Sequence, residues 1–148
     1  MALAAVPAKA ADAPTLGHWM VAISVADLDK ETAFFVDKLG FKVELDTKFG
    51  PGIPVRWLTS GNERIELLQI KDSKPPATPR AKPPGHAAVQ GISQITLSTS
   101  DIEATKAALL AKGVTPALDV TEVAPLGVKV MYVQDPEGNA IEIAQKIG

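Results

Sequence analysis

The sequence of 148 residues contains no cysteine, a single tyrosine and no long run of basic residues. The absence of cysteine excludes thiol nucleophiles, thiolate metal sites and disulfides. No apolar stretch approaches the roughly 20 residues that a membrane-spanning helix requires. Nucleic acids and anionic membranes need clustered Lys and Arg, whereas the net charge of this chain is −2. These absences favour a small molecule as the main ligand.

The chain is 46% hydrophobic, which is enough for one substantial core built without disulfides or metals. Residues 1–16 are rich in Ala and Pro and lack the alternation that follows. We expect them to form a tail, either a disordered extension or the end of a signal peptide, because Ala8-Lys9-Ala10 has the small-x-small form of a cleavage site. The predicted compartment is the cytoplasm, or the periplasm if residues 1–10 end a signal peptide.

Residues 17–71 predict a first unit of one strand, one helix and three strands. Apolar and smaller residues alternate from Trp19 to Val25, which is the period of a strand. Asp27 is a good N-cap for the helix that should follow, and Gly40 is a good C-terminal stop. Three strand-like segments come next, at residues 41–47, 55–60 and 64–70, separated by turns rich in Gly.

Residues 87–148 repeat this order and predict a second unit. A strand at residues 92–99 precedes a helix for which Ser100 and Glu103 predict a capping box, and three more strands follow. Asp27 corresponds to Asp101, an offset of 74, and Glu66 corresponds to Glu142, an offset of 76. An internal duplication is the simplest explanation.

Between the units, residues 72–86 form a Pro-rich segment that we expect to be extended and semi-rigid. Residues 72–85 contain five prolines and three basic residues. This segment is either a simple linker, the interpretation we favour, or a lid.

The duplicated unit, with VADLDKETAFFVDKLGF at residues 25–41 and DPEGNAIEIAQ at residues 135–145, resembles the vicinal oxygen chelate superfamily. This group includes glyoxalase I, bleomycin-resistance proteins, extradiol dioxygenases, methylmalonyl-CoA epimerase and fosfomycin-resistance enzymes. The resemblance covers residues 17–147. It implies an α+β fold in which two tandem βαβββ units form a curved mixed eight-stranded sheet around a cavity.

The resemblance also implies a divalent metal held by one residue from each first strand and one from each last strand. The usual first-strand ligand is a His seven residues before the Asp that starts the helix, and Met20 and Gln94 occupy these positions. The closing-strand ligands correspond to Glu66 and Glu142. Glu66, Gln94 and Glu142 offer oxygen donors suited to nickel, zinc, manganese or magnesium, but the Met20 thioether is a poor ligand for hard cations. The protein is therefore either a metal protein with an incomplete ligand set or metal-free.

Both glutamates lie between apolar neighbours, so each points to the opposite face of its strand from those neighbours. That face is either solvent or a cavity, and the recurrence at duplicated positions favours the cavity. Other candidates for substrate binding are His18, Met20, Gln94, Arg56 and Trp57. Arg56 is either an anion contact beside the aromatic wall of Trp57 or an exposed arginine of an edge strand. Tyr132 is either a phenolic donor or an ordinary strand residue.

Three functions are compatible with these residues. The first is a lyase or isomerase that moves a proton beside a carbonyl group, with Glu66 or Glu142 as metal ligand or base. The second is a metal-free protein that binds and sequesters a small molecule or drug, which Met20 favours because its side chain is apolar and adaptable. The third is a metal-independent enzyme that uses the two carboxylates alone. Dioxygenase chemistry is disfavoured because its iron site needs two His. The exposed strand edges and the resemblance predict a homodimer.

Overall fold

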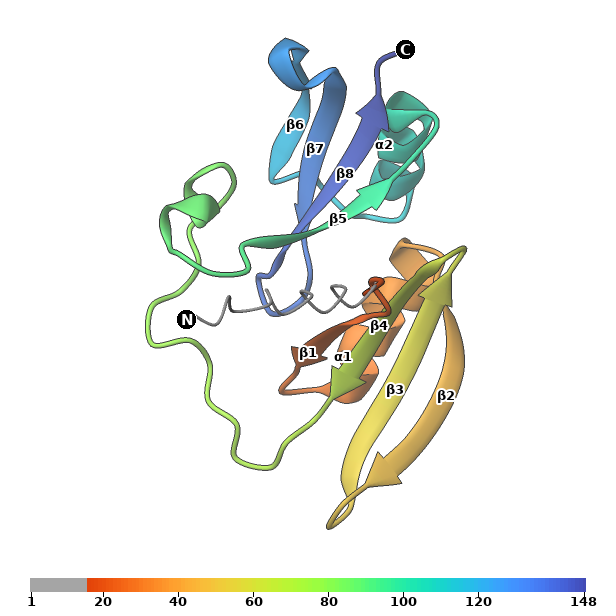
Figure 1. The fold of residues 1–148 in the computed structure, drawn as a ribbon, viewed down its shortest axis with the longest axis vertical. Coiled ribbons are helices and arrows are strands. Elements are labelled where there is room, and N and C mark those ends of the chain that lie inside the picture. Colours follow the sequence, from red (N-terminus) through yellow and green to blue (C-terminus); the bar gives the residue numbers. More distant parts are fainter. Residues whose placement is uncertain (1–15) are drawn as a thin grey trace, which may run out of the picture.

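The computed structural model describes residues 16–148, so almost all of the predicted tail lies outside the described residues. In the first unit the elements are β1 (Val21–Ser24), α1 (Leu28–Ala33), the π-helical turn η1 (Phe34–Lys38), β2 (Lys42–Phe49), β3 (Ile53–Ser60) and β4 (Glu63–Leu68). In the second they are β5 (Gln94–Ser98), α2 (Ile102–Ala111), β6 (Leu118–Val123), the 3-10 turn η3 (Ala124–Leu126), β7 (Val128–Gln134) and β8 (Ala140–Lys146). One further 3-10 turn, η2 (Gly85–Ala88), lies in the segment between the units (Figure 1). The predicted order of strand, helix and three strands is confirmed in both units.

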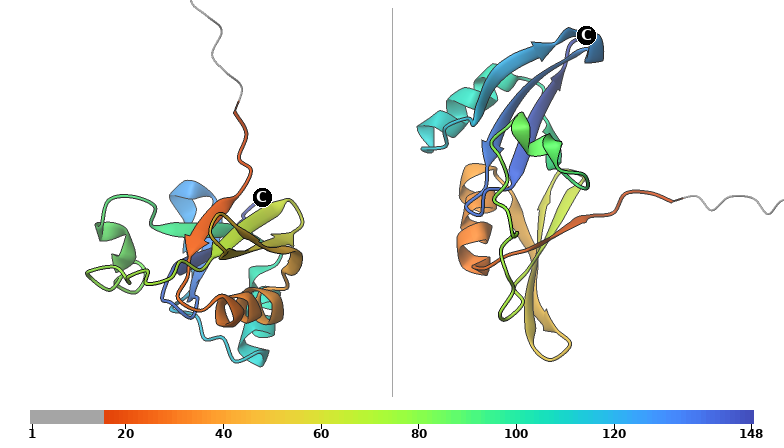
Figure 2. Two further views of the ribbon diagram at one scale, coloured as in Figure 1. Left: turned by 90° about the horizontal axis from the view of Figure 1, so that it is seen from below. Right: turned by 90° about the vertical axis from the view of Figure 1, so that its left-hand side faces the viewer.

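The eight strands form two four-stranded mixed sheets, ordered β1-β4-β3-β2 and β5-β8-β7-β6. In each sheet the first and last strands of the unit are parallel neighbours, and the other pairs are antiparallel. Figure 2 shows α1 and α2 on the same side of the two sheets. The opposite faces, which we call the open faces, carry no helix of their own unit.

Each helix begins with an aspartate that caps it. The Asp27 carboxylate accepts a hydrogen bond from the Lys30 amide at 3.0 Å, and the Asp101 carboxylate accepts one from the Ala104 amide at 2.9 Å. The predicted capping box with Ser100 as N-cap was therefore wrong, because the cap lies one residue later. The predicted helix stop at Gly40 has a φ of +76°, a conformation that favours glycine.

A single hydrophobic core joins the two units on the helix side of the sheets. It includes buried residues from α1, β3 and β4 as well as from α2, β7 and β8. Its fully buried members include Phe35, Leu58, Ile65, Leu67, Ile102, Met131 and Ile141. None of the helices in residues 16–148 is long and apolar enough to cross a membrane.

Candidate functional site

Glu66 lies on the open face of the first sheet. Its neighbours Ile65 and Leu67 are buried in the core on the other side of β4, so strand alternation turns the Glu66 side chain away from the helices. Register places Glu66 between Ala22 of β1 and Trp57 of β3. The indole Nε1 of Trp57 donates a hydrogen bond to Glu66 Oε2 at 2.7 Å. The glutamate predicted from the duplication is thus half-buried beside an aromatic ring.

An aromatic and cationic cluster extends from Trp57 across this face. The rings of Trp19 and Trp57 meet edge to face, with centroids 5.6 Å apart. The Arg64 guanidinium lies 5.7 Å from the Trp19 ring centroid and 5.4 Å from that of Trp57, distances at which cation–π attraction operates. Two hydrogen bonds of 2.7 Å join Arg64 to the Glu44 carboxylate and lower the pKa of Glu44. The Arg64 charge is therefore already paired, while Trp19 remains 60% exposed.

Glu142 occupies the corresponding position on the second sheet, where three side chains donate to its carboxylate. Register places it between Thr96 of β5 and Tyr132 of β7. The Tyr132 hydroxyl donates to Glu142 Oε1 at 2.7 Å. Glu142 Oε2 accepts from the Thr96 hydroxyl at 2.7 Å and from Gln94 Nε2 at 2.9 Å. Burial, together with the neighbouring Glu142 carboxylate, raises the pKa of Tyr132 to about 12, so Tyr132 stays a phenol donor at neutral pH.

His86 joins this second site, although no sequence pattern pointed to it. It comes from η2, is only 4% exposed and has its ring edge against Tyr132, with centroids 5.1 Å apart. Its Nε2 lies 2.7 Å from Gln94 Oε1. The segment that carries His86 has no counterpart in the duplicated units, so the comparison of the two halves could not identify it.

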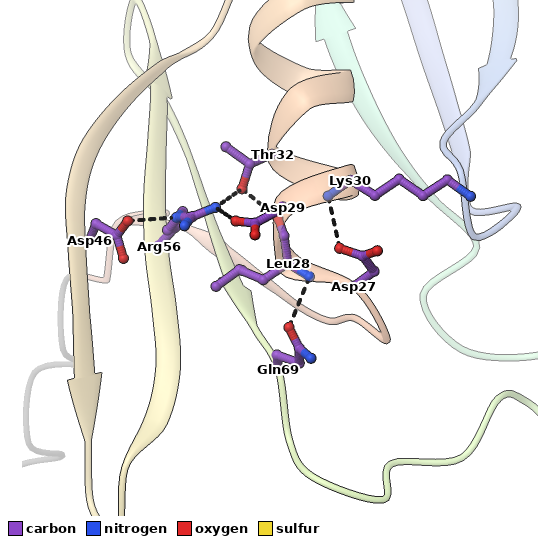
Figure 3. A network of polar contacts seen from close by, with 8 residues as sticks. All are labelled: Asp27, Leu28, Asp29, Lys30, Thr32, Asp46, Arg56 and Gln69. Carbon is purple, nitrogen blue, oxygen red and sulfur yellow. Dashed lines mark hydrogen bonds and ion pairs between the residues drawn. The ribbon is translucent and has the colours of Figure 1, made fainter.

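The remaining predicted site residues are distributed differently. Arg56 points to the helix side of β3, opposite to Trp57, and contacts Asp29 at 2.6 Å and Asp46 at 2.8 Å (Figure 3). Arg56 and Trp57 therefore do not form one binding wall. Met20 is half-buried just before β1, and His18 is exposed.

A cavity of about 960 Å³ lies between β1, the start of β5, the β7–β8 turn and the segment between the units. Its polar lining residues include Ser24, Lys74, Arg80, Gln94 and Glu137. This volume is within the usual range for small-molecule sites. Gln94 belongs both to this cavity and to the hydrogen-bonded group around Glu142.

A family model described as the Glyoxalase/Bleomycin resistance protein/Dioxygenase superfamily matches residues 15–143. The chain belongs to this superfamily. No curated protein matches this chain.

Several solved structures share the fold of this chain. A glyoxalase family protein from Enterococcus faecalis is 21% identical, with a TM-score of 0.70 over 87% of this chain and 97% of that chain. A glyoxalase family protein from Bacillus cereus is also 21% identical, with a TM-score of 0.71 over 95% and 100%. An antibiotic binding protein from Streptomyces sp. CB03234 is 20% identical, with a TM-score of 0.67 over 90% and 98%.

The residues at the expected metal positions do not fit a divalent cation. Glu142 Oε2 already accepts two hydrogen bonds, and Gln94 turns its NH₂ group, not its oxygen, toward that carboxylate. Glu66 accepts from Trp57, and Met20 supplies only a thioether. Within residues 16–148, no three His, Cys, Asp or Glu side chains form a group that could hold a metal.

Proposed function

We propose that this protein binds a small, flat organic molecule on the open face of its first sheet, without a metal. The observation that carries the proposal is the cluster of Trp19, Trp57 and Arg64 beside the Glu66 carboxylate. Trp19 presents a largely exposed ring, which offers stacking area to an aromatic ligand. The hydrogen bond from Trp57 to Glu66 fixes the second ring and the carboxylate relative to each other.

The charges of the cluster favour a ligand that carries a hydrogen-bond donor or a positive charge. Arg64 is neutralised by Glu44. Glu66, in contrast, has no ion pair with any described residue, and no described residue other than Trp57 donates a hydrogen bond to it. A flat aromatic molecule with an amino or amidine group would stack on the indole rings and donate to Glu66. The antibiotic-binding function named for the Streptomyces protein makes aromatic antibiotics suitable first compounds.

Intrinsic fluorescence can test this proposal because Trp19 and Trp57 are the only tryptophans of the chain. Flat aromatic amines should change the emission saturably, and the same rings without a nitrogen donor should bind more weakly. Glu66→Gln should weaken amine binding by about tenfold or more, since it removes a charged acceptor. Glu63→Gln, a change on the same strand but on its other face, should leave the affinity unchanged. Equal affinities in the wild type and Glu66→Gln would contradict the proposal.

A second candidate is a lyase or isomerase reaction at Glu142, favoured by the 2.7 Å contact between a carboxylate and a phenol. Glu142 would accept a proton from the carbon next to a carbonyl group, while Tyr132 would donate its proton to the carbonyl oxygen and form an enol. Hydroxyketones and ketoacids should then exchange that hydrogen with heavy water in the presence of the protein. Glu142→Gln should abolish the exchange, and exchange that persists in this variant would exclude Glu142 as the base.

A further inference from the structure

The segment between the two sheets is anchored by few residues. In residues 71–91, only Pro83 and His86 are buried. His86 is the one that makes a polar contact with a sheet, through its 2.7 Å approach to Gln94 of β5. A polar imidazole is buried here in a segment that is almost entirely exposed, which suggests that its burial has a specific role.

Hydrogen-bond chemistry fixes the orientation of every group in this contact. An ionised Glu142 can only accept, so Gln94 must present its NH₂ group there. The carbonyl oxygen of Gln94 then faces His86, and an oxygen acceptor requires a hydrogen on His86 Nε2. His86 Nδ1 is buried without a hydrogen-bond partner among the described residues. The contacts form a chain from His86 through Gln94 to Glu142, which Tyr132 and Thr96 complete.

We propose that His86 is a positioning residue for Glu142: its Nε2–H holds the Gln94 amide so that the NH₂ group faces the carboxylate. Gln94 thereby supplies a neutral donor at a strand position where the resemblance implied a metal ligand. This role concerns the second sheet and does not depend on the ligand of the first. It also connects the segment between the units to the cavity, because Gln94 lines that cavity.

Without His86, the two orientations of the amide would differ less in energy. If the amide turned over, its oxygen would meet the Glu142 carboxylate, and two acceptors would face each other. A side chain that served packing alone would not need to be histidine, because an apolar ring would fill the same place without leaving Nδ1 buried and unpartnered. The unpartnered atom therefore supports a specific role for Nε2.

Nuclear magnetic resonance of the whole chain can test the proposal without a ligand. Nitrogen shifts of the two histidines should show that His86 carries a hydrogen on Nε2. The Gln94 NH₂ protons should exchange slowly with solvent. In His86→Phe, which keeps a ring against Tyr132, this exchange should become about tenfold faster, the effect of losing one hydrogen bond. His86→Gln can place an amide nitrogen near the position of Nε2 and should restore slow exchange, while His18→Gln should change nothing.

Two results would overturn the proposal. One is a His86 tautomer with its hydrogen on Nδ1 alone, because the oxygen of Gln94 would then have no donor. The other is slow exchange of Gln94 in a folded His86→Phe protein, which would mean that packing alone orients the amide. If His86→Phe does not fold, His86→Leu provides the variant without a donor, and the position of the ring hydrogen is measured on the wild type, which requires no substitution.

Discussion

Lys38 and Lys112 each donate a hydrogen bond to the main-chain carbonyl oxygen of the other. The distance is 2.7 Å from Lys38 Nζ to the Lys112 oxygen and 3.3 Å from Lys112 Nζ to the Lys38 oxygen. The two residues are 74 positions apart, the offset that also separates Asp27 from Asp101. Each lysine lies at a helix end, where carbonyl groups lack intrahelical partners and a positive charge is favourable. The duplicated helices therefore stabilise each other's ends.

Replacement of either lysine should lower the stability of the protein. Lys38→Met and Lys112→Met should each reduce the free energy of unfolding by about 0.5–1 kcal/mol, because the contacts are partly exposed to solvent. Urea denaturation can measure this loss. Lys48→Met, a lysine of β2 without a described partner, is the matched control. Variants that are as stable as this control would show that the reciprocal contact contributes nothing.

A second duplicated contact connects the end of β4, and likewise the end of β8, to the start of the helix of the same unit. Gln69 Oε1 accepts from the Leu28 amide at 3.0 Å (Figure 3), and Gln145 Oε1 accepts from the Ile102 amide at 2.8 Å. Gln→Ala at either position should cost about 1 kcal/mol in the free energy of unfolding. Gln→Glu should be tolerated, because a negative charge is favourable at a helix N-terminus. Denaturation curves in which Glu destabilises as much as Ala would contradict this role.

The comparison of the two halves explains which features the sequence could predict. The helix start at Asp27 and the helix stop at Gly40 follow from the residue preferences of helix ends. The open-face positions of Glu66 and Glu142 recur in both units and follow from strand periodicity. Gln69 and Gln145, which accept hydrogen bonds from the helix starts, also recur, each three residues after Glu66 or Glu142. The same comparison could have found them. The residues that contact the glutamates differ between the halves, with Trp57 in one and Tyr132 in the other, so duplication predicts a position but not its chemistry.

Two further differences between the sequence analysis and the structure have physical causes. Arg56 and Trp57 are adjacent in one strand, so alternation alone directs them to opposite faces, and their combination as one wall neglected that rule. His86 belongs to a segment whose placement depends on tertiary contacts with β5 and β7. Local sequence carries no signal of such contacts.

Arg56 should be important for stability but not for binding. Its guanidinium contacts Asp29 and Asp46 and donates to the Thr32 hydroxyl at 3.1 Å, on the side of β3 that faces α1. Arg56→Met should lower the free energy of unfolding by about 1 kcal/mol, a modest value because both aspartates are well exposed. The same variant should titrate with aromatic amines as the wild type does when followed by tryptophan fluorescence. A weakened affinity in a fully folded Arg56→Met protein would contradict this assignment.

Glu31 of α1 should make the protein less stable as the pH rises. Its side chain is fully buried. Burial, reinforced by the neighbouring Asp135 and Glu137 carboxylates, raises the pKa of Glu31 from 4.5 to about 9. In the unfolded chain this group loses its proton near pH 4.5, whereas the folded protein keeps it until about pH 9. Glu31 therefore does not change the stability of the protein at pH values below its pKa in the unfolded chain, and it lowers the stability at higher pH.

Between these two pH values the free energy of unfolding should fall by about 1.4 kcal/mol per pH unit from this group alone. Glu31→Gln keeps the shape of the neutral acid but cannot ionise, so it should remove this slope and should be more stable than the wild type at pH 8. Urea denaturation at pH 6, 7 and 8 can measure both effects. Glu103→Gln in the first turn of α2 serves as the control, because Glu103 is exposed. If the wild type and Glu31→Gln lose stability in parallel with rising pH, Glu31 is not the group responsible.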